Sequence, residues 1–179
     1  MKKAISAALT AVFLFFGCSA FSPGVNSGDG NRVLFGNIYG TVTDGQTGNP
    51  VPDALIYVTD QPVRFVSEKT DGAVLSDQGW IRVPPPEPAI RRATSQPDGS
   101  YMVNRIPLNE KYGLYTLVIK AEGFDNTVID QAPVLPGASM ALNINCRLTR
   151  TGRAHLIRVF KGHENVDINY SDELKQPPQ

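Results

Sequence analysis

The sequence predicts an all-β protein whose main part, residues 32–149, is a single antiparallel β-sandwich. Short segments alternate apolar and polar residues with a period of two, which is typical of half-buried strands. Clusters of Gly, Pro, Asn and Asp stand between these segments and favour turns. This part has no convincing helical period, and about 110 residues is a suitable size for one core.

The first two expected strands flank a turn. In the segment IYGTV, the residues Ile38, Gly40 and Val42 face one way. The turn-forming cluster DGQTGNP comes next and includes Gly48 and Pro50. The segment ALIYV then alternates in the same manner, so the pattern is strand, turn, strand.

Three further strands are expected in the second half of this part. The motif Pro-Asp-Gly in ATSQPDGSYMV predicts a tight turn at Gly99, after which Tyr101 and Val103 face one way. The segments YTLVIKAEGF and LNINCRL alternate as well. In the second of these, Cys146 falls on the buried face, where a cysteine behaves as a small hydrophobe with a shielded thiol.

The succession YGTVTD, TGNPVPDALIYV, SQPDGSYMVNRIP, YTLVIKAEGF and LNINCRL resembles the carboxypeptidase regulatory-like domain. That family has a transthyretin-like (prealbumin-like) sandwich of about seven strands, and the likeness runs from Asn37 to Leu148 with one large interruption. The resemblance implies a non-catalytic module with no catalytic residue to carry over. The positions that match the family pattern are interpreted as turn and core positions: Gly40, Gly48, Pro50, Ala54, Gly99, Tyr101, Gly123 and Phe124.

The interruption is an insertion, residues 61–89, longer than compact domains normally carry without a purpose. It holds the one tryptophan of the chain, Trp80, then Arg82 and the run Pro84, Pro85 and Pro86, which favours polyproline II. One interpretation is a rigid recognition loop that projects from the sandwich. The other is a β-hairpin that folds back through Trp80 and its neighbours to cover a sheet edge. The sequence leaves both open.

The N-terminus has the layout of a secretory signal: two lysines, an apolar run and then small residues. Its end, FFGC, resembles the lipobox of bacterial lipoproteins, which implies a signal peptide over residues 1–17 and a covalent lipid on Cys18. Cleavage after Ala20, giving a soluble secreted product, is the alternative. Residues 18–31 are rich in Ser, Gly, Pro and Asn and are expected to form a flexible linker.

Charge and residue content argue against nucleic-acid binding and against catalysis. The chain has 17 basic and 17 acidic residues, and loss of Lys2 and Lys3 with the signal leaves a net charge of −2, which does not attract a polyanion. The two histidines, His155 and His163, do not begin the His-x-x-Glu pattern of zinc peptidases. We therefore expect no enzyme, no metal and no cofactor apart from the lipid.

These observations predict a non-catalytic, membrane-anchored lipoprotein of the cell envelope whose sandwich serves protein binding or envelope assembly. In a Gram-negative cell, Ser19 resembles the sorting pattern for the outer membrane, facing the periplasm or the cell surface. The partner would be an envelope protein or a glycan. Alternatives are a glycan-binding module that uses Trp80 and a structural subunit of a secretion or envelope complex. Residues 150–179 are expected to add one strand, HLIRVFK, and a polar tail.

Overall fold

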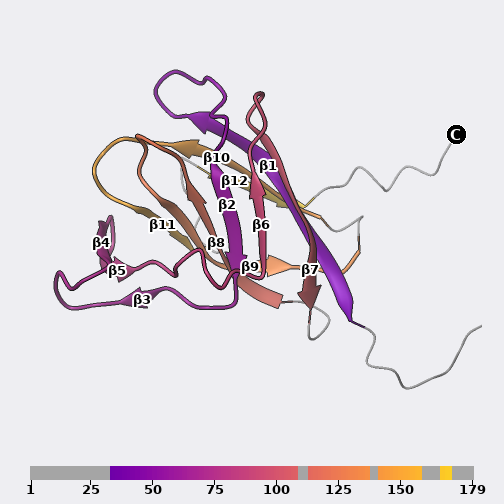
Figure 1. The fold of residues 1–179 in the computed structure, drawn as a ribbon, viewed down its shortest axis with the longest axis horizontal. Coiled ribbons are helices and arrows are strands. Elements are labelled where there is room, and N and C mark those ends of the chain that lie inside the picture. Colours follow the sequence, from indigo (N-terminus) through magenta and orange to yellow (C-terminus); the bar gives the residue numbers. More distant parts are fainter. Residues whose placement is uncertain (1–32, 109–112, 138–140, 159–165, 171–179) are drawn as a thin grey trace, which may run out of the picture. The chain divides into compact units, whose positions relative to one another are not determined.

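The computed structural model describes residues 33–108, 113–137, 141–158 and 166–170, and the side chains of all but the last of these ranges. These residues belong to one compact unit, Arg32–Gln179, and form twelve strands and no helix (Figure 1). A search of the described ranges for a helix long and apolar enough to span a membrane finds none. The prediction of an all-β sandwich is confirmed.

The sandwich has a four-stranded and a five-stranded sheet. In the four-stranded sheet the spatial order is β12 (Val166–Tyr170), β10 (Leu142–Leu148), β1 (Leu34–Asp44) and β7 (Ser100–Leu108). In the five-stranded sheet it is β11 (His155–Arg158), β9 (Thr127–Val134), β8 (Gly113–Lys120), β2 (Leu55–Thr59) and β6 (Arg91–Thr94). Seven of these strands, β1, β2 and β6–β10, make up the part that resembles the family.

The main core lies between the two sheets and follows the alternation of the sequence. Ile38 and Val42 of β1 face Leu117 and Ile119 of β8, and all four side chains are fully buried. The apolar positions of β10 line the same core: Leu142, Ile144, Cys146 and Leu148. Because one face of each strand enters this core, a slip of one residue would turn its apolar side chains outward, and the register is strongly specified.

Two strand pairs are parallel, so the expectation of a wholly antiparallel sandwich needs correction. Strand β1 runs parallel to β10, and β9 runs parallel to β11. Neither pair is joined by a hairpin: between β9 and β11 the chain crosses to the four-stranded sheet, forms β10 and returns. A parallel pair requires such a crossover, and short-range turn signals in the sequence do not reveal it.

The C-terminal segment adds two strands among the described residues, where the sequence predicted one. Strand β11 extends the five-stranded sheet beside β9, and β12 pairs antiparallel with β10 in the four-stranded sheet. Each therefore pairs with a strand that would otherwise be a sheet edge and becomes the last strand of its sheet. The final nine residues, which belong to the expected polar tail, lie outside the described residues.

The insertion forms a third layer, the insertion sheet, in the order β3 (Arg64–Phe65), β5 (Gly79–Arg82) and β4 (Ala73–Ser76). Figure 1 shows these three short strands grouped at the lower left, away from β1 and β7. Between them and the five-stranded sheet lies a second core, made of Tyr57, Ile81, Val118, Val128, Ala154 and Leu156. The five-stranded sheet thus has a core on each of its faces, whereas no described strand covers the outer face of the four-stranded sheet.

Candidate recognition surface

The insertion is fixed to the sandwich through its inner face. Ile81 of β5 is fully buried in the second core, beside Tyr57 of β2. The Tyr57 hydroxyl donates a hydrogen bond of 2.6 Å to the carbonyl oxygen of Pro84, and burial raises the pKa of Tyr57 to about 12. The proline run therefore begins at an anchored residue: Pro84 is buried, whereas Pro85 is exposed.

The turn between β4 and β5 also covers the outer edge of β11. The Leu156 amide donates to Oδ1 of Asp77 at 3.3 Å, and its carbonyl accepts from Nε2 of Gln78 at 2.9 Å. The Ala154 amide donates to the carbonyl of Leu75 at 2.8 Å. The hairpin interpretation holds in this respect. The insertion covers a sheet face as well as an edge, because its apolar side chains pack against the five-stranded sheet in the second core.

The outer face of the insertion sheet carries the residues that sequence reasoning singled out. Since Ile81 points into the second core, its neighbours Trp80 and Arg82 point the other way. Arg64 of β3 stands opposite Arg82 in the strand register. Both arginines are exposed and Trp80 is half-buried. One rigid surface therefore presents an indole ring and two guanidinium groups.

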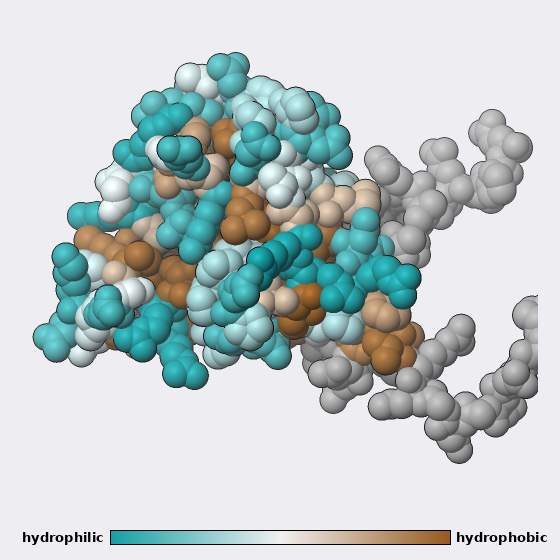
Figure 2. All heavy atoms as spheres, in the orientation of Figure 1, coloured by the Kyte–Doolittle hydropathy of each residue, from teal (hydrophilic) through white to brown (hydrophobic). Residues whose placement is uncertain are grey.

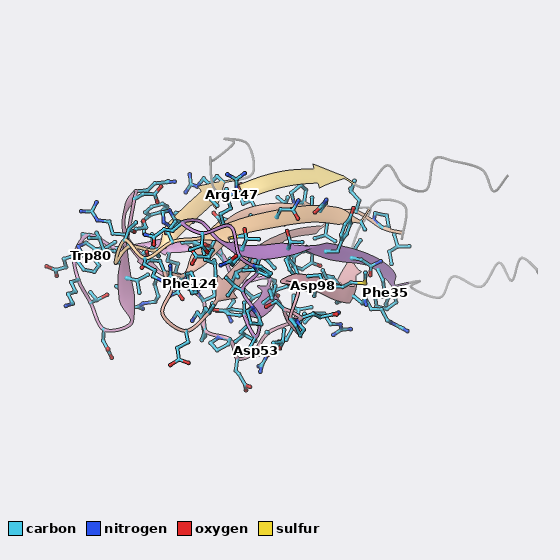
Figure 3. All side chains as sticks on the ribbon, turned by 90° about the horizontal axis from the view of Figure 1, so that it is seen from above. Phe35, Asp53, Trp80, Asp98, Phe124 and Arg147 are labelled. Carbon is cyan, nitrogen blue, oxygen red and sulfur yellow. The ribbon has the colours of Figure 1, made fainter. Side chains whose placement is uncertain are left out.

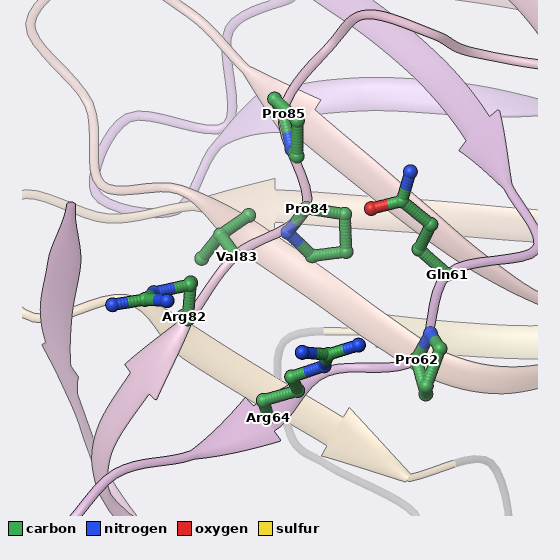
Figure 4. A pocket seen from close by; sticks show the side chains of 7 residues that line it. All are labelled: Gln61, Pro62, Arg64, Arg82, Val83, Pro84 and Pro85. Atoms are coloured by element: carbon green, nitrogen blue, oxygen red, sulfur yellow. The ribbon is translucent and has the colours of Figure 1, made fainter.

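A small hollow beside the two arginines has a volume of about 160 Å³ (Figure 4). Its lining residues come from both ends of the insertion: Gln61, Pro62, Arg64, Arg82, Val83, Pro84 and Pro85. Arg82 reaches Oγ1 of Thr70 and the carbonyl of Asp71 only at 3.4 Å, and Arg64 makes no ion pair within the described part of the chain. Like charges directly opposite on neighbouring strands repel each other, so the pair favours an anionic group nearby.

A larger open groove of about 450 Å³ joins the insertion to the sandwich. Trp80, Leu75 and Lys69 line it from the insertion, and Phe124 and Asn126 from the loop between β8 and β9. Figure 3 shows Trp80 and Phe124 toward the same end of the unit, with Phe35 at the other end. Figure 2 shows hydrophobic side chains on the surface where Figure 1 places β4 and β5. Two aromatic residues thus border one accessible groove.

Phe124 is held in place by charged neighbours. The Arg150 guanidinium lies 3.9 Å from the centroid of its ring and donates to Oδ2 of Asp44 at 3.0 and 3.1 Å. Hydrogen bonds from Arg150 and from the Gln46 amide lower the pKa of Asp44. This wall of the groove is therefore preorganised rather than free to collapse.

Apart from Phe124, none of the predicted turn and core residues lines either of these two hollows. A Cβ on Gly40 would overlap the carbonyl oxygen of Ile144, and the Tyr101 hydroxyl donates to that same carbonyl at 2.8 Å. Gly48 and Gly99 have φ of 72° and 79°, the left-handed region that favours glycine. Pro50 forms an isolated bridge with Thr43 beside the turn.

Cys146 is 1% exposed and free, and its burial raises the pKa of its thiol to about 12. A thiol that stays protonated is a poor nucleophile. In the described ranges no three His, Cys, Asp and Glu side chains are grouped closely enough to hold a metal ion. The predicted lipidation site, Cys18, lies outside the described residues.

Fold and site together define a small β-sandwich domain that carries an additional inserted sheet. The family model for the carboxypeptidase regulatory-like domain matches residues 37–148, which is more than half of the 179-residue chain. The chain belongs to this family, whose domains are non-catalytic β-sandwich modules. A search of curated proteins returned no match.

Sequence reasoning missed two contributors to the surface. Arg64 was not singled out, because its position opposite Arg82 follows from the pairing of β3 with β5 and not from spacing. Phe124 was interpreted as structural, and the structure adds that it borders the Trp80 groove. The continuous apolar run LIYV in β2 could have indicated that a second layer covers this strand, since such runs are typical of strands that are buried on both faces.

Proposed function

We propose that this chain is a non-catalytic lipoprotein of the bacterial cell envelope, anchored by a lipid on Cys18, whose sandwich binds a protein partner. The single observation that supports binding is the outer face of the insertion sheet, where Trp80, Arg82 and Arg64 lie together on a fixed layer. Trp and Arg are enriched among the residues that dominate protein interfaces.

The rigidity of this surface favours recognition over simple packing. If the insertion only covered the sheet, its inner face would suffice, and its outer face could carry any solvated residues. Instead an aromatic ring and two arginines that form no ion pair with a described carboxylate project from this layer. The second core and the Tyr57–Pro84 hydrogen bond hold the layer in place. Preorganised side chains lose less conformational entropy on binding.

Crosslinking in intact cells followed by affinity capture tests the proposal. The variant is Trp80→Ala with Arg82→Ala, because deletion of the insertion would expose Tyr57 and Val118 and confound the result. Arg91→Ala, an exposed arginine on β6, is the control. We expect the wild type and the control to capture one defined envelope protein that the double variant loses. Equal capture by all three would show that the insertion serves packing alone.

The anchor has its own test. We expect radiolabelled palmitate to enter the wild-type chain and to be absent from Cys18→Ser, which should leave the membrane fraction. A mature N-terminus at Phe21, without lipid, would instead establish cleavage after Ala20 and a secreted protein. This result does not depend on the outcome of the capture experiment.

A glycan is the second candidate ligand, because Trp80 and Phe124 border the same open groove. Aromatic rings can stack on the apolar faces of sugars, while Asn126 and Lys69 would supply hydrogen bonds. Affinity electrophoresis in polysaccharide gels tests it, and loss of retardation in Trp80→Ala would favour it. Recovery of the chain in a large detergent-stable complex would favour a structural subunit of an envelope machine instead.

A further inference from the structure

A third groove lies on the outer face of the four-stranded sheet, on the side of the sandwich that the insertion does not cover. We propose that this groove, the amide groove, binds a neutral sugar. It shares no residue with the insertion sheet, so the inference goes beyond the proposed function and stands independently of it. The groove has a volume of about 360 Å³, within the range of small-molecule sites.

The amide groove is built from rows of side chains that the strand register sets side by side. Tyr39 of β1 lies between Met102 of β7 and Asn143 of β10. The next outward-facing row on the same strands begins two residues further along β1. There Thr41 lies opposite Ser100 and donates a hydrogen bond to Asn145. The side chains that the argument uses are Tyr39, Thr41, Gln96, Met102, Asn143 and Asn145.

One amide of the groove lacks a hydrogen-bond partner. The Oδ1 atom of Asn143 is covered and accepts no hydrogen bond from the part of the chain that the structure describes. A covered acceptor without a donor is costly, and native structures usually satisfy such atoms. Because Asn143 lines the groove, a rotation of its side chain would bring this oxygen to a ligand that donates a hydrogen bond.

The neighbouring side-chain amide, that of Asn145, is fixed by hydrogen bonds through its oxygen, and its nitrogen can still donate. Oδ1 of Asn145 accepts from the Thr41 backbone amide and from the Thr41 hydroxyl, both at 3.0 Å. Because a backbone N–H can only donate, these bonds settle which side-chain atom of Asn145 is the oxygen. Its amide nitrogen makes no hydrogen bond within the described residues, so two donors remain for a ligand.

The lining favours a neutral hydroxylated ligand over an ion or a peptide. Among the described side chains that line the groove there is no Asp, Glu, Lys or Arg, so an acidic ligand would find no counter-charge there. The strand register places Asp167 of β12 opposite Asn145, which also disfavours an acidic ligand. Strands β10 and β1, which carry most of the groove, have a partner strand on both sides, so an extended peptide cannot add to their backbones. Side-chain amides both donate and accept, as sugar hydroxyls do.

The apolar side chains of the groove and the two asparagines of β10 also favour a sugar. Tyr39 and Met102, which is 56% exposed, offer apolar surface for the C–H faces of a sugar ring. Asparagine is disfavoured in strands, so its presence at both Asn143 and Asn145 on one face of β10 is not explained by strand propensity. Hydrogen bonding to a ligand accounts for it.

Calorimetric titration of the full detergent-solubilised chain tests the proposal, with maltohexaose, cellohexaose and the hexamer of N-acetylglucosamine as neutral probes and oligogalacturonate as the acidic one. We expect at least one neutral probe to bind, with an affinity that salt does not change. Asn143→Ala and Tyr39→Ala should each weaken binding by about tenfold or more, the loss of one good contact. Tyr39→Phe, which keeps the ring, should retain most of the affinity.

Two controls make the result decisive. Asn143→Ala removes an unpartnered acceptor, so its thermal unfolding should match or exceed that of the wild type while binding falls, which a merely structural role would not produce. Arg91→Ala, an exposed arginine on β6 of the other sheet, should bind the sugar as the wild type does. Absence of binding by every neutral probe, binding of the acidic probe alone, or loss of binding in Trp80→Ala but not in Tyr39→Ala would each overturn the proposal.

Discussion

Gly40 marks a place where β1 and β10 approach each other closely. Its backbone lies so near the Ile144 carbonyl that any Cβ would overlap the oxygen, although its φ is not in the left-handed region. Gly48 is the converse case, with a φ of 72° and no atom within 4 Å of a Cβ. These two glycines of the family pattern therefore serve different physical needs.

This difference predicts unequal costs of substitution. Gly40→Ala should lower the free energy of unfolding by about 1–3 kcal/mol, because strand β10 must move to relieve the overlap. Gly48→Ala should cost only about 1 kcal/mol, since backbone conformation alone is strained. Urea unfolding of both variants measures the two values. Equal costs would contradict the close approach of β1 and β10.

Cys146 allows a second prediction at the residue scale. Because burial raises its thiol pKa to about 12, the folded chain should not react with an aromatic disulfide reagent at pH 8, whereas the urea-unfolded chain should react at once. Cys18→Ser serves as the background, so that only one thiol is present. Rapid reaction in native buffer would show that β10 opens locally.

The same shift gives stability a pH dependence with a definite sign. The unfolded thiol ionises near its ordinary pKa of about 8.5, whereas the folded one stays protonated. The contribution of Cys146 is therefore fully present below about pH 8.5 and declines as pH rises from there toward 12. Replacement by Ala should make the unfolding free energy less dependent on pH between 8.5 and 10 than it is in the wild type.

At the scale of elements, the insertion sheet depends on a few contacts with β2. Tyr57→Phe removes the hydrogen bond to the Pro84 carbonyl but keeps the ring in the second core. We expect this substitution to lower the free energy of unfolding by about 1–2 kcal/mol. Hydrogen exchange should show faster exchange in residues 62–89 than in β1 or β8. Uniform acceleration across the domain would instead mean that the insertion and the sandwich unfold as one unit.

The strands of the sandwich were predictable because each has a local pattern in the sequence. In β10 the alternation around Cys146 identifies the buried face, and in β7 the Pro-Asp-Gly turn fixes where the strand begins. The parallel pairing of β1 with β10 has no such local pattern, because the partners are about a hundred positions apart in the sequence.

The candidate site was predictable only in part, for the same reason. Trp80 and Arg82 stand out in the sequence by residue type. That Ile81 turns inward, so that both face outward, depends on the packing of β5 against β2, which spacing alone does not specify. The amide groove needs the register of three strands, and its asparagines resemble ordinary solvated residues when read one strand at a time.

At the scale of the whole unit, the C-terminal extension completes the fold beyond the family boundary at Leu148. Leu156 of β11 is fully buried and Ile157 nearly so, one in each core. A chain that ends at Leu148 should lose about 3–6 kcal/mol from these two side chains. That is a large share of the stability of a typical domain, so we expect it to aggregate or to unfold at low urea.

Urea titration and gel filtration of the shortened chain measure this effect. Leu156→Ala in the full chain provides a milder version, with an expected loss of about 2–5 kcal/mol. A shortened chain as stable as the full one would mean that the seven-stranded part is self-sufficient and that β11 is only an appendage.

The central position of β1 has a consequence for the order of folding. Its partners β7 and β10 are synthesised later, and the hydrogen bond between Thr41 and Asn145 joins residues 104 positions apart in the sequence. Until β7 has been synthesised β1 has no partner at either edge, and the main core cannot close until β10 exists. Such long-range pairing slows folding, so the earliest strand to be synthesised is among the last to find its place.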